Sequence, residues 1–201
     1  VNTSGDTYWF MQTGRDVWQT KSIPTQAIHT YGVIDKSFNS VEWLAGLIYY
    51  ISVTVFGIKG LLILRVILAL STLFIIYQTI RLFTKNHLIL NTALLFVSYI
   101  LATRTNDRPE TFSYLFIAIL NYACLLFIYQ KRLSPLFYLF PLLFLIWPHT
   151  HPFAIMGICL FLFYAGFLTK EKHFDKQNYP KYSTFLIIFL SSILLAFSQH
   201  K

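Results

Sequence analysis

Four charged side chains lie close together in the stretch Arg104-Thr105-Asn106-Asp107-Arg108-Pro109-Glu110. The apolar runs on either side of it, 88–103 and 111–130, contain no Asp, Glu, Lys, Arg or His. Two guanidinium groups four positions apart can bind a phosphate, and carboxylates can orient them or hold a divalent cation such as Mg²⁺ or Mn²⁺. The sequence predicts that Arg104 and Arg108 bind phosphate and that Asp107 and Glu110 have one of these supporting roles. The alternative is a solvated turn whose charges keep it out of lipid.

A fifth candidate, Asp6, stands directly before the aromatic run Thr7-Tyr8-Trp9-Phe10. A carboxylate held against aromatic rings at a membrane surface is poorly hydrated and suited to act as a general base. An equally simple interpretation is a helix N-cap, because Asp is favoured at that position. Local features alone favour the cap.

Further candidates lie at two other places in the chain. Lys59 and Arg65 fall near the start of an apolar run, where Lys59 can extend to the headgroups and Arg65 is expected to face a polar cavity or a lipid phosphate. His149 and His151 stand between Pro148 and Pro152, which predicts a tight non-helical turn. Alternate residues of an extended segment diverge, so one of these histidines is expected to bind an anionic ligand instead of sharing a metal, with helix capping as the alternative.

The composition identifies the class of protein that must position these groups. Hydrophobic residues form 56% of the 201-residue chain, charged residues only 12%, and the mean hydropathy is +0.57. A soluble domain of this size could not bury so much apolar surface, so the sequence predicts an all-α, polytopic integral membrane protein. The net charge of +8 lies in short loops between apolar runs, which indicates membrane topology and argues against nucleic-acid binding.

The apolar runs and the basic loops together predict a topology. About six transmembrane helices are expected, at residues 58–80, 88–103, 111–130, 133–148, 152–169 and 183–199. Basic residues occupy every second connection, which the positive-inside rule places in the cytoplasm: Arg81 and Lys85, Lys131 and Arg132, and Lys170, Lys172, Lys176 and Lys181. Residues 1–57, 104–110 and 149–151 are then outside. The run 41–56 is expected to lie along the outer interface, because an ordinary crossing there would reverse every later loop. The alternative is an ordinary span in a protein that breaks the positive-inside rule.

Short motifs in this order resemble one family of membrane enzymes. They are Gly5-Asp6 with Trp9, then Gly14, Ile23-Pro24, Glu42-Trp43-Leu44, Arg108-Pro109-Glu110 and the turn from Trp147 to Pro152. The chain resembles the bacterial GT-C-type polytopic glycosyltransferases, which are related to the dolichyl-phosphate-mannose protein mannosyltransferases. The resemblance implies a polyprenyl-phosphate-linked sugar as donor, inverting transfer, and an acceptor glycan, lipid or protein outside the cytoplasm. It also implies further segments before Val1 and after Lys201.

The predicted function is therefore transfer of a sugar at the outer face of a bacterial cell membrane. Residues 1–57 form the first extracytoplasmic loop with interfacial helices, and 58–201 form a helical bundle that is incomplete at both ends. Asp6 is the expected base, with Trp9, His149 and His151 lining the pocket. The donor phosphate is expected to meet Lys59, Arg65, Arg104 and Arg108. The alternatives are a transporter or flippase of an anionic lipid or sugar, and a non-catalytic protein of envelope assembly.

Overall fold

The computed structural model of this protein describes residues 5–24, 42–104, 108–130 and 135–170, and the single residues 183, 184, 187, 190 and 191. For residues 167–170 it describes the backbone alone. The described residues form helices and no strands. The helices are α1 (Gly5–Thr20), α2 (Trp43–Phe56), α3 (Lys59–Arg81), α4 (His87–Arg104), α5 (Glu110–Gln130), the 3₁₀ helix η1 (Pro135–Leu139), α6 (Phe140–Thr150) and α7 (Ala154–Lys170).

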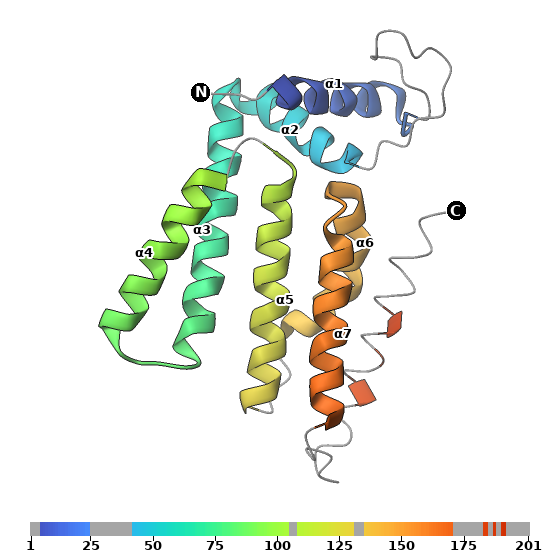
Figure 1. Cartoon of the computed structure of the whole chain (residues 1–201). Coiled ribbons are helices and arrows are strands. Elements are labelled where there is room, and N and C mark those ends of the chain that lie inside the picture. Colours follow the sequence, from blue (N-terminus) through green and yellow to red (C-terminus); the bar gives the residue numbers. More distant parts are fainter. Residues whose placement is uncertain are drawn as a thin grey trace.

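Helices α3 to α7 run along a common direction, while α1 and α2 lie across one end of them (Figure 1). The connection between α4 and α5 and the turn between α6 and α7 are both at this end. The connection between α3 and α4, which carries Lys85, is at the opposite end. Within the described residues, the basic turn that carries Lys85 therefore lies at the opposite end from the two polar turns, as the sequence predicts.

Three of the described helices are long and apolar enough to cross a membrane, namely α3, α4 and α5. They coincide with the predicted runs 58–80, 88–103 and 111–130. Large apolar side chains remain exposed along α3 and α4, as expected for helices that face lipid: Leu62, Ile63, Val66, Ile67, Leu70, Phe74, Leu88, Ile89, Leu95 and Phe96. The segments Pro135–Thr150 and Ala154–Gly166 are apolar but shorter. Most of the predicted run 183–199 lies outside the described residues.

Helix α2 corresponds to the predicted interfacial segment 41–56 and packs against α1, α3 and α6. Its contact with α1 depends on two glycines. A Cβ at Gly14 would overlap the carbonyl oxygen of Gly46, and a Cβ at Gly46 would overlap that of Phe10. Small residues allow two helix backbones to approach this closely. The two glycines therefore permit a tight crossing of α1 over α2.

The chain then reverses from α2 into α3 at Gly57, whose φ of 65° is one that glycine adopts readily. Gly60 in the first turn of α3 lies against the Ser52 carbonyl, where a side chain would not fit. The reversal brings Leu61 and Leu68 of α3 into a buried cluster with Tyr49 of α2. These contacts hold the α1–α2 pair over the end of the bundle.

The second buried cluster is formed by α5, η1, α6 and α7 and consists largely of aromatic rings. Trp147 is fully buried there and meets Phe116 edge-to-face, with the ring centroids 5.5 Å apart. Gly157 of α7 leaves room for this indole, because a Cβ would overlap two of its ring carbons. The cluster fixes the end of α6, and with it the two histidines that follow Trp147.

Candidate functional site at the end of the bundle

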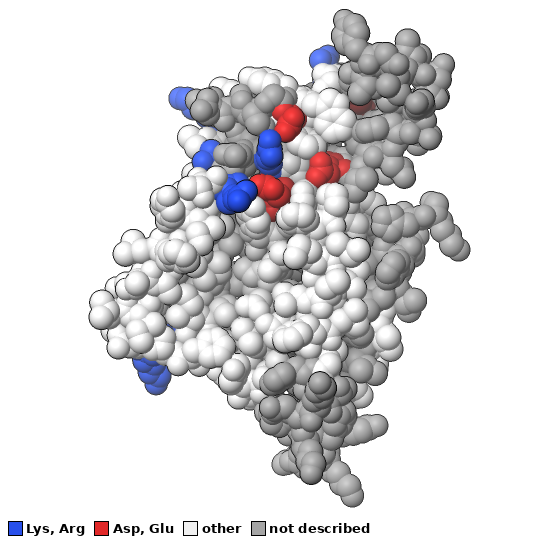
Figure 2. Space-filling view, in the orientation of Figure 1, with Lys and Arg blue, Asp and Glu red and all other residues white. Residues whose placement is uncertain are grey.

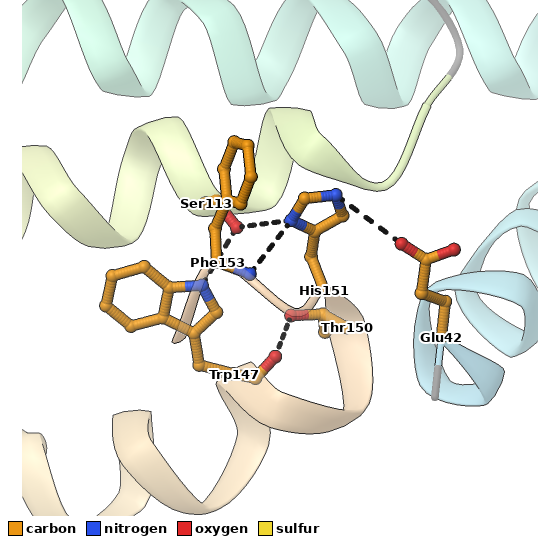
Figure 3. A network of polar contacts seen from close by, with 6 residues as sticks. All are labelled: Glu42, Ser113, Trp147, Thr150, His151 and Phe153. Atoms are coloured by element: carbon orange, nitrogen blue, oxygen red, sulfur yellow. Dashed lines mark hydrogen bonds and ion pairs between the residues drawn. The ribbon is translucent and has the colours of Figure 1, made fainter. Parts of the chain in front are cut away.

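The contact that organises the site joins Glu42, at the start of α2, to His151, in the turn after α6 (Figure 3). His151 Nε2 lies 3.4 Å from Glu42 Oε1, and the side chains are 14% and 22% exposed. A half-buried carboxylate beside an imidazole is an arrangement suited to proton transfer.

The orientation of the His151 ring follows from its other neighbours. The Phe153 backbone N–H donates to His151 Nδ1 at 3.2 Å, so Nδ1 is the acceptor nitrogen of the neutral ring. The ring proton is then on Nε2, facing Glu42. The Ser113 hydroxyl lies 3.4 Å from the same Nδ1 and can donate to it, while it accepts the indole N–H of Trp147 at 2.8 Å. Figure 3 shows this chain of polar contacts running from Trp147 through Ser113 and His151 to Glu42.

His149 makes a separate link between the same elements. The indole N–H of Trp43, at the start of α2, donates to His149 Nδ1 at 3.1 Å, and the two ring centroids lie 5.2 Å apart. Both histidines therefore link the start of α2 to the end of α6.

Asp6 is held by the turn between α4 and α5. Arg108 donates to Asp6 Oδ2 at 3.1 Å, and the side chains are 48% and 61% exposed. Asp6 lies in the first turn of α1, next to Tyr8 and Trp9 in the sequence, yet it is open to solvent. The structure thus places Asp6 in an exposed ion pair, and its role as a base stays a prediction. The ion pair instead connects the first loop to the second polar turn.

Glu110 completes the cluster of charges. It is the first residue of α5, directly after Pro109, and accepts a hydrogen bond from Tyr114 one turn along. The negative charge of Glu110 acts to raise the pKa values of Glu42 and His151. The positive charge of Arg104 interacts with the Tyr114 hydroxyl. Figure 2 shows acidic and basic side chains gathered near the α1–α2 end, with an uncharged surface below them and basic side chains at the other end.

Burial shapes the protonation of the two central groups. Burial raises the pKa of Glu42 from 4.5 to about 7, with smaller contributions from the negative charges of Asp6 and Glu110. Burial lowers the pKa of His151, against the opposing effect of Glu110. At neutral pH the pair therefore consists of a neutral imidazole and a carboxylic acid close to its midpoint.

A cavity of about 460 Å³ lies between α3, α4 and α5, next to this cluster. Its volume is within the range of small-molecule sites. Arg104 and Tyr114 contribute to its lining, which is otherwise largely apolar and extends to Asn121: Thr72, Ile76, Ile100, Leu101, Ile117 and Ala118. An apolar cavity that includes a guanidinium group is suited to a lipid chain with an anionic head.

The other predicted site residues are placed as follows. Lys59 is the first residue of α3 and is exposed, and Arg65 is half-buried about 9 Å further along the helix. Within the described residues, neither is joined by a hydrogen bond or ion pair to the Asp6–Arg108 pair or to Glu42. Trp9 is half-buried and packs edge-to-face on Phe10. Asp107 lies outside the described residues.

The prediction of a non-helical turn from His149 to His151 is wrong for His149. Helix α6 continues through Pro148 to Thr150, and only His151 is extended, with φ −165° and ψ 143°. The carbonyl of Trp147 accepts both the Thr150 hydroxyl and the His151 N–H, which closes the helix later than expected. A proline removes one backbone donor but does not prevent the next turn when other donors satisfy the helix end.

The sequence interpretation missed Glu42, Ser113 and Trp147 as members of the site. Glu42 and Trp147 belong to motifs noted above, but nothing local distinguishes Glu42 from a headgroup-level charge. Ser113 carries a recognisable signal, since it is a hydroxyl three residues after Glu110 at the start of an apolar helix. Its partners come from α6 and the following turn, so its role depends on tertiary packing.

In the part of the chain that the structure describes, no group of three or more His, Cys, Asp or Glu side chains is placed to hold a metal ion. Comparison with models of known protein families, with curated proteins and with solved structures found no match to this chain. The site described above is thus characterised by its own geometry, at one end of an all-helical bundle with three helices able to cross a membrane.

Proposed function

We propose that this protein is a polytopic membrane glycosyltransferase of the GT-C type. It transfers a sugar from a polyprenyl phosphate to an acceptor glycan, lipid or protein outside the cytoplasm. In this proposal η1 with α6, α7 and the segment 183–199 complete six spans, and α1 and α2 rest on the outer membrane surface. The enzyme inverts the configuration of the transferred sugar.

The observation that carries this proposal is the meeting of the charged cluster with the apolar cavity. Arg104 lines the cavity beside Tyr114, and Tyr114 contacts Glu110 of the charged cluster. A lipid-linked phosphate needs an apolar site for its chain and cations for its head. Transfer needs, in addition, a carboxylate to accept the proton of the acceptor hydroxyl. The cavity, which extends from Arg104 to Asn121, supplies the first of these, and the charged cluster at the α1–α2 end supplies the cations and the carboxylates.

The roles follow from this arrangement. Arg104 and Arg108 stabilise the polyprenyl phosphate as it leaves the anomeric carbon, and Lys59 and Arg65 attract its headgroup to the surface. Glu110 orients the cations. The assignment of Asp6 as the base, made from the sequence, remains a prediction. The ion pair with Arg108 makes Asp6 less suited to accept a proton.

The proposal is tested in membrane vesicles that contain the protein, with radiolabelled polyprenyl-phosphate mannose, glucose and galactose as donors. Ile100 lines the cavity and is 44% exposed, so Ile100→Trp should narrow the cavity without disturbing the core. Leu95→Trp, on the exposed face of the same helix, is the matched control.

We expect the wild type and Leu95→Trp to transfer label from at least one donor, and Ile100→Trp to transfer it ~10-fold more slowly at low donor concentration. Movement of the labelled donors between leaflets without transfer would instead establish a flippase. Absence of both activities with every donor would overturn the proposed function.

A further inference from the structure

We propose that Glu42, positioned by His151, is the carboxylate that removes the proton from the acceptor hydroxyl. This inference rests on the proposed function and assigns the base of the transfer to the start of α2. Asp6 is in turn a positioning residue, which holds Arg108 for the donor phosphate.

The two carboxylates differ in what surrounds them. Asp6 Oδ2 is occupied by Arg108 at 3.1 Å, and the Asp6 side chain is 61% exposed. Glu42 is 22% exposed and faces the imidazole of His151. A base must be shielded from bulk water and must keep a lone pair for the substrate proton. Glu42 meets both conditions, whereas Asp6 is committed to a cation.

Contacts at Nδ1, on the side of the ring away from Glu42, hold His151 in one tautomer. Its Nδ1 accepts the Phe153 N–H and lies beside the Ser113 hydroxyl, so its Nε2–H points to Glu42. Ser113 and Trp147 are fully buried and hydrogen-bonded to each other, which leaves the ring little freedom to turn. A histidine held this way orients the Glu42 carboxylate and stabilises the negative charge of that carboxylate before it accepts the acceptor proton.

The chemical step requires Glu42 as the base and the two arginines at the leaving phosphate. The O–H bond of the acceptor breaks and its proton moves to a carboxylate oxygen of Glu42. The freed oxygen electron pair forms a bond to the anomeric carbon of the donor sugar. The bond between that carbon and the phosphate oxygen breaks, and its electron pair leaves with the polyprenyl phosphate, where Arg104 and Arg108 meet the charge.

The step predicts a dependence on pH that is set by the groups facing Glu42. These are Asp6 from α1, Glu110 from α5 and His151 from the turn after α6. Two further groups lie nearby: Arg108 is paired with Asp6, and His149 accepts a hydrogen bond from Trp43. Only the ionised base accepts a proton. Because the pKa of Glu42 is raised to about 7, transfer should increase as the pH rises through this value.

The test compares Glu42→Gln with Asp16→Asn in the vesicle assay described above, using the donor that the wild type accepts. The glutamine keeps the size of the side chain and an oxygen for the His151 N–H, but it accepts no proton. Asp16, ten residues after Asp6 on α1 and not among the charges that act on Glu42, serves as the control. We expect Glu42→Gln to lose ~10²-fold or more of the rate constant kcat, and Asp16→Asn to retain it. Asp6→Asn should act mainly on KM for the donor.

The positioning role of His151 is tested by His151→Phe and His151→Gln. Phenylalanine keeps the ring and its packing on Phe153 but has no donor for Glu42. The acid limb of the pH–kcat profile should therefore move to higher pH in His151→Phe, and His151→Gln, which retains an N–H, should restore it. A lower rate with an unmoved limb would show a structural role only and would overturn the positioning assignment.

Transfer by Glu42→Gln at more than half the wild-type rate would overturn Glu42 as the base and leave the transferase intact. Absence of transfer by the wild type with every donor would overturn the proposed function and this step together.

Discussion

Replacing Glu42 by glutamine should stabilise the protein toward pH 8 while it lowers the rate of transfer by ~10²-fold or more. The folded-state pKa of Glu42 is about 7 against an ordinary value of 4.5, so the folded protein binds this proton more tightly than the unfolded chain. The stability associated with this proton is fully present below pH 4.5 and is lost as the pH rises through 7. The glutamine side chain has no such proton, so the variant avoids the loss.

The size of the effect follows from the same values. Moving a pKa from 4.5 to about 7 corresponds to ~3 kcal/mol that an ionised Glu42 costs the folded state. Because 22% of the side chain remains in contact with solvent, we take ~2 kcal/mol as the working value. For a chain of 201 residues this corresponds to ~4–8 °C in Tm.

The measurement is thermal unfolding of purified wild type and Glu42→Gln in one detergent, at intervals from pH 5 to pH 8. The lowered pKa of His151 acts in the opposite direction, since it removes stability as the pH falls below 6.5. That contribution is confined to the acid end of the range, so the difference between the two proteins from pH 7 to pH 8 reports Glu42. We expect Glu42→Gln to gain Tm over the wild type progressively toward pH 8.

A Tm difference that stays constant from pH 5 to pH 8 would refute the reasoning, because it would mean that Glu42 titrates alike in the folded and unfolded protein. A variant that is less stable than the wild type at pH 8 would refute it as well. In that case the ionised carboxylate would be supported by the surrounding charges instead of opposed by burial.

Three further outcomes are expected from other parts of the molecule. Ser113→Ala removes the acceptor of the buried Trp147 indole N–H, which should lower the free energy of unfolding by ~1–3 kcal/mol in denaturant titrations. An unchanged free energy would contradict the buried network. Gly46→Ala forces α2 away from α1 and should lower the Tm, whereas Gly166→Ala, where a Cβ meets open space, should not; equal effects would contradict the tight crossing. Single cysteines at Pro152 and Lys85, in a chain without native cysteines, should react with a membrane-impermeant maleimide from opposite sides of the membrane; labelling from one side would remove the proposed topology.

Much of the fold follows from the sequence because length and apolar content are local properties. The runs 58–80, 88–103 and 111–130 become helices α3, α4 and α5 with each end shifted by one residue at most. Pro109 marks the start of α5 as expected. The end of α6 was harder to predict, since Pro148 is an ambiguous signal. Whether a helix stops at a proline depends on donors such as Thr150 and the His151 N–H, whose positions the sequence does not reveal.

The candidate site was only partly accessible from the sequence. Because basic residues occupy every second connection, the sequence predicts that Arg108 and His151 lie at the same end of the bundle, and the structure confirms that they lie there. The pairing of individual charges could not be predicted. Asp6, expected to stand against aromatic rings, is exposed and paired with Arg108, while Glu42, expected at headgroup level, is half-buried beside His151.

The sequence by itself determined that the chain is helical and apolar and which turns share an end, because each depends on the chemistry of neighbouring residues. Only the tertiary structure decided which carboxylate is shielded and which is paired. That outcome depends on the crossing angle and depth of α1 and α2, which are set by backbone contacts at Gly14 and Gly46. Burial and charge pairing act between side chains from distant segments, so they become defined only once these helices are packed across the bundle.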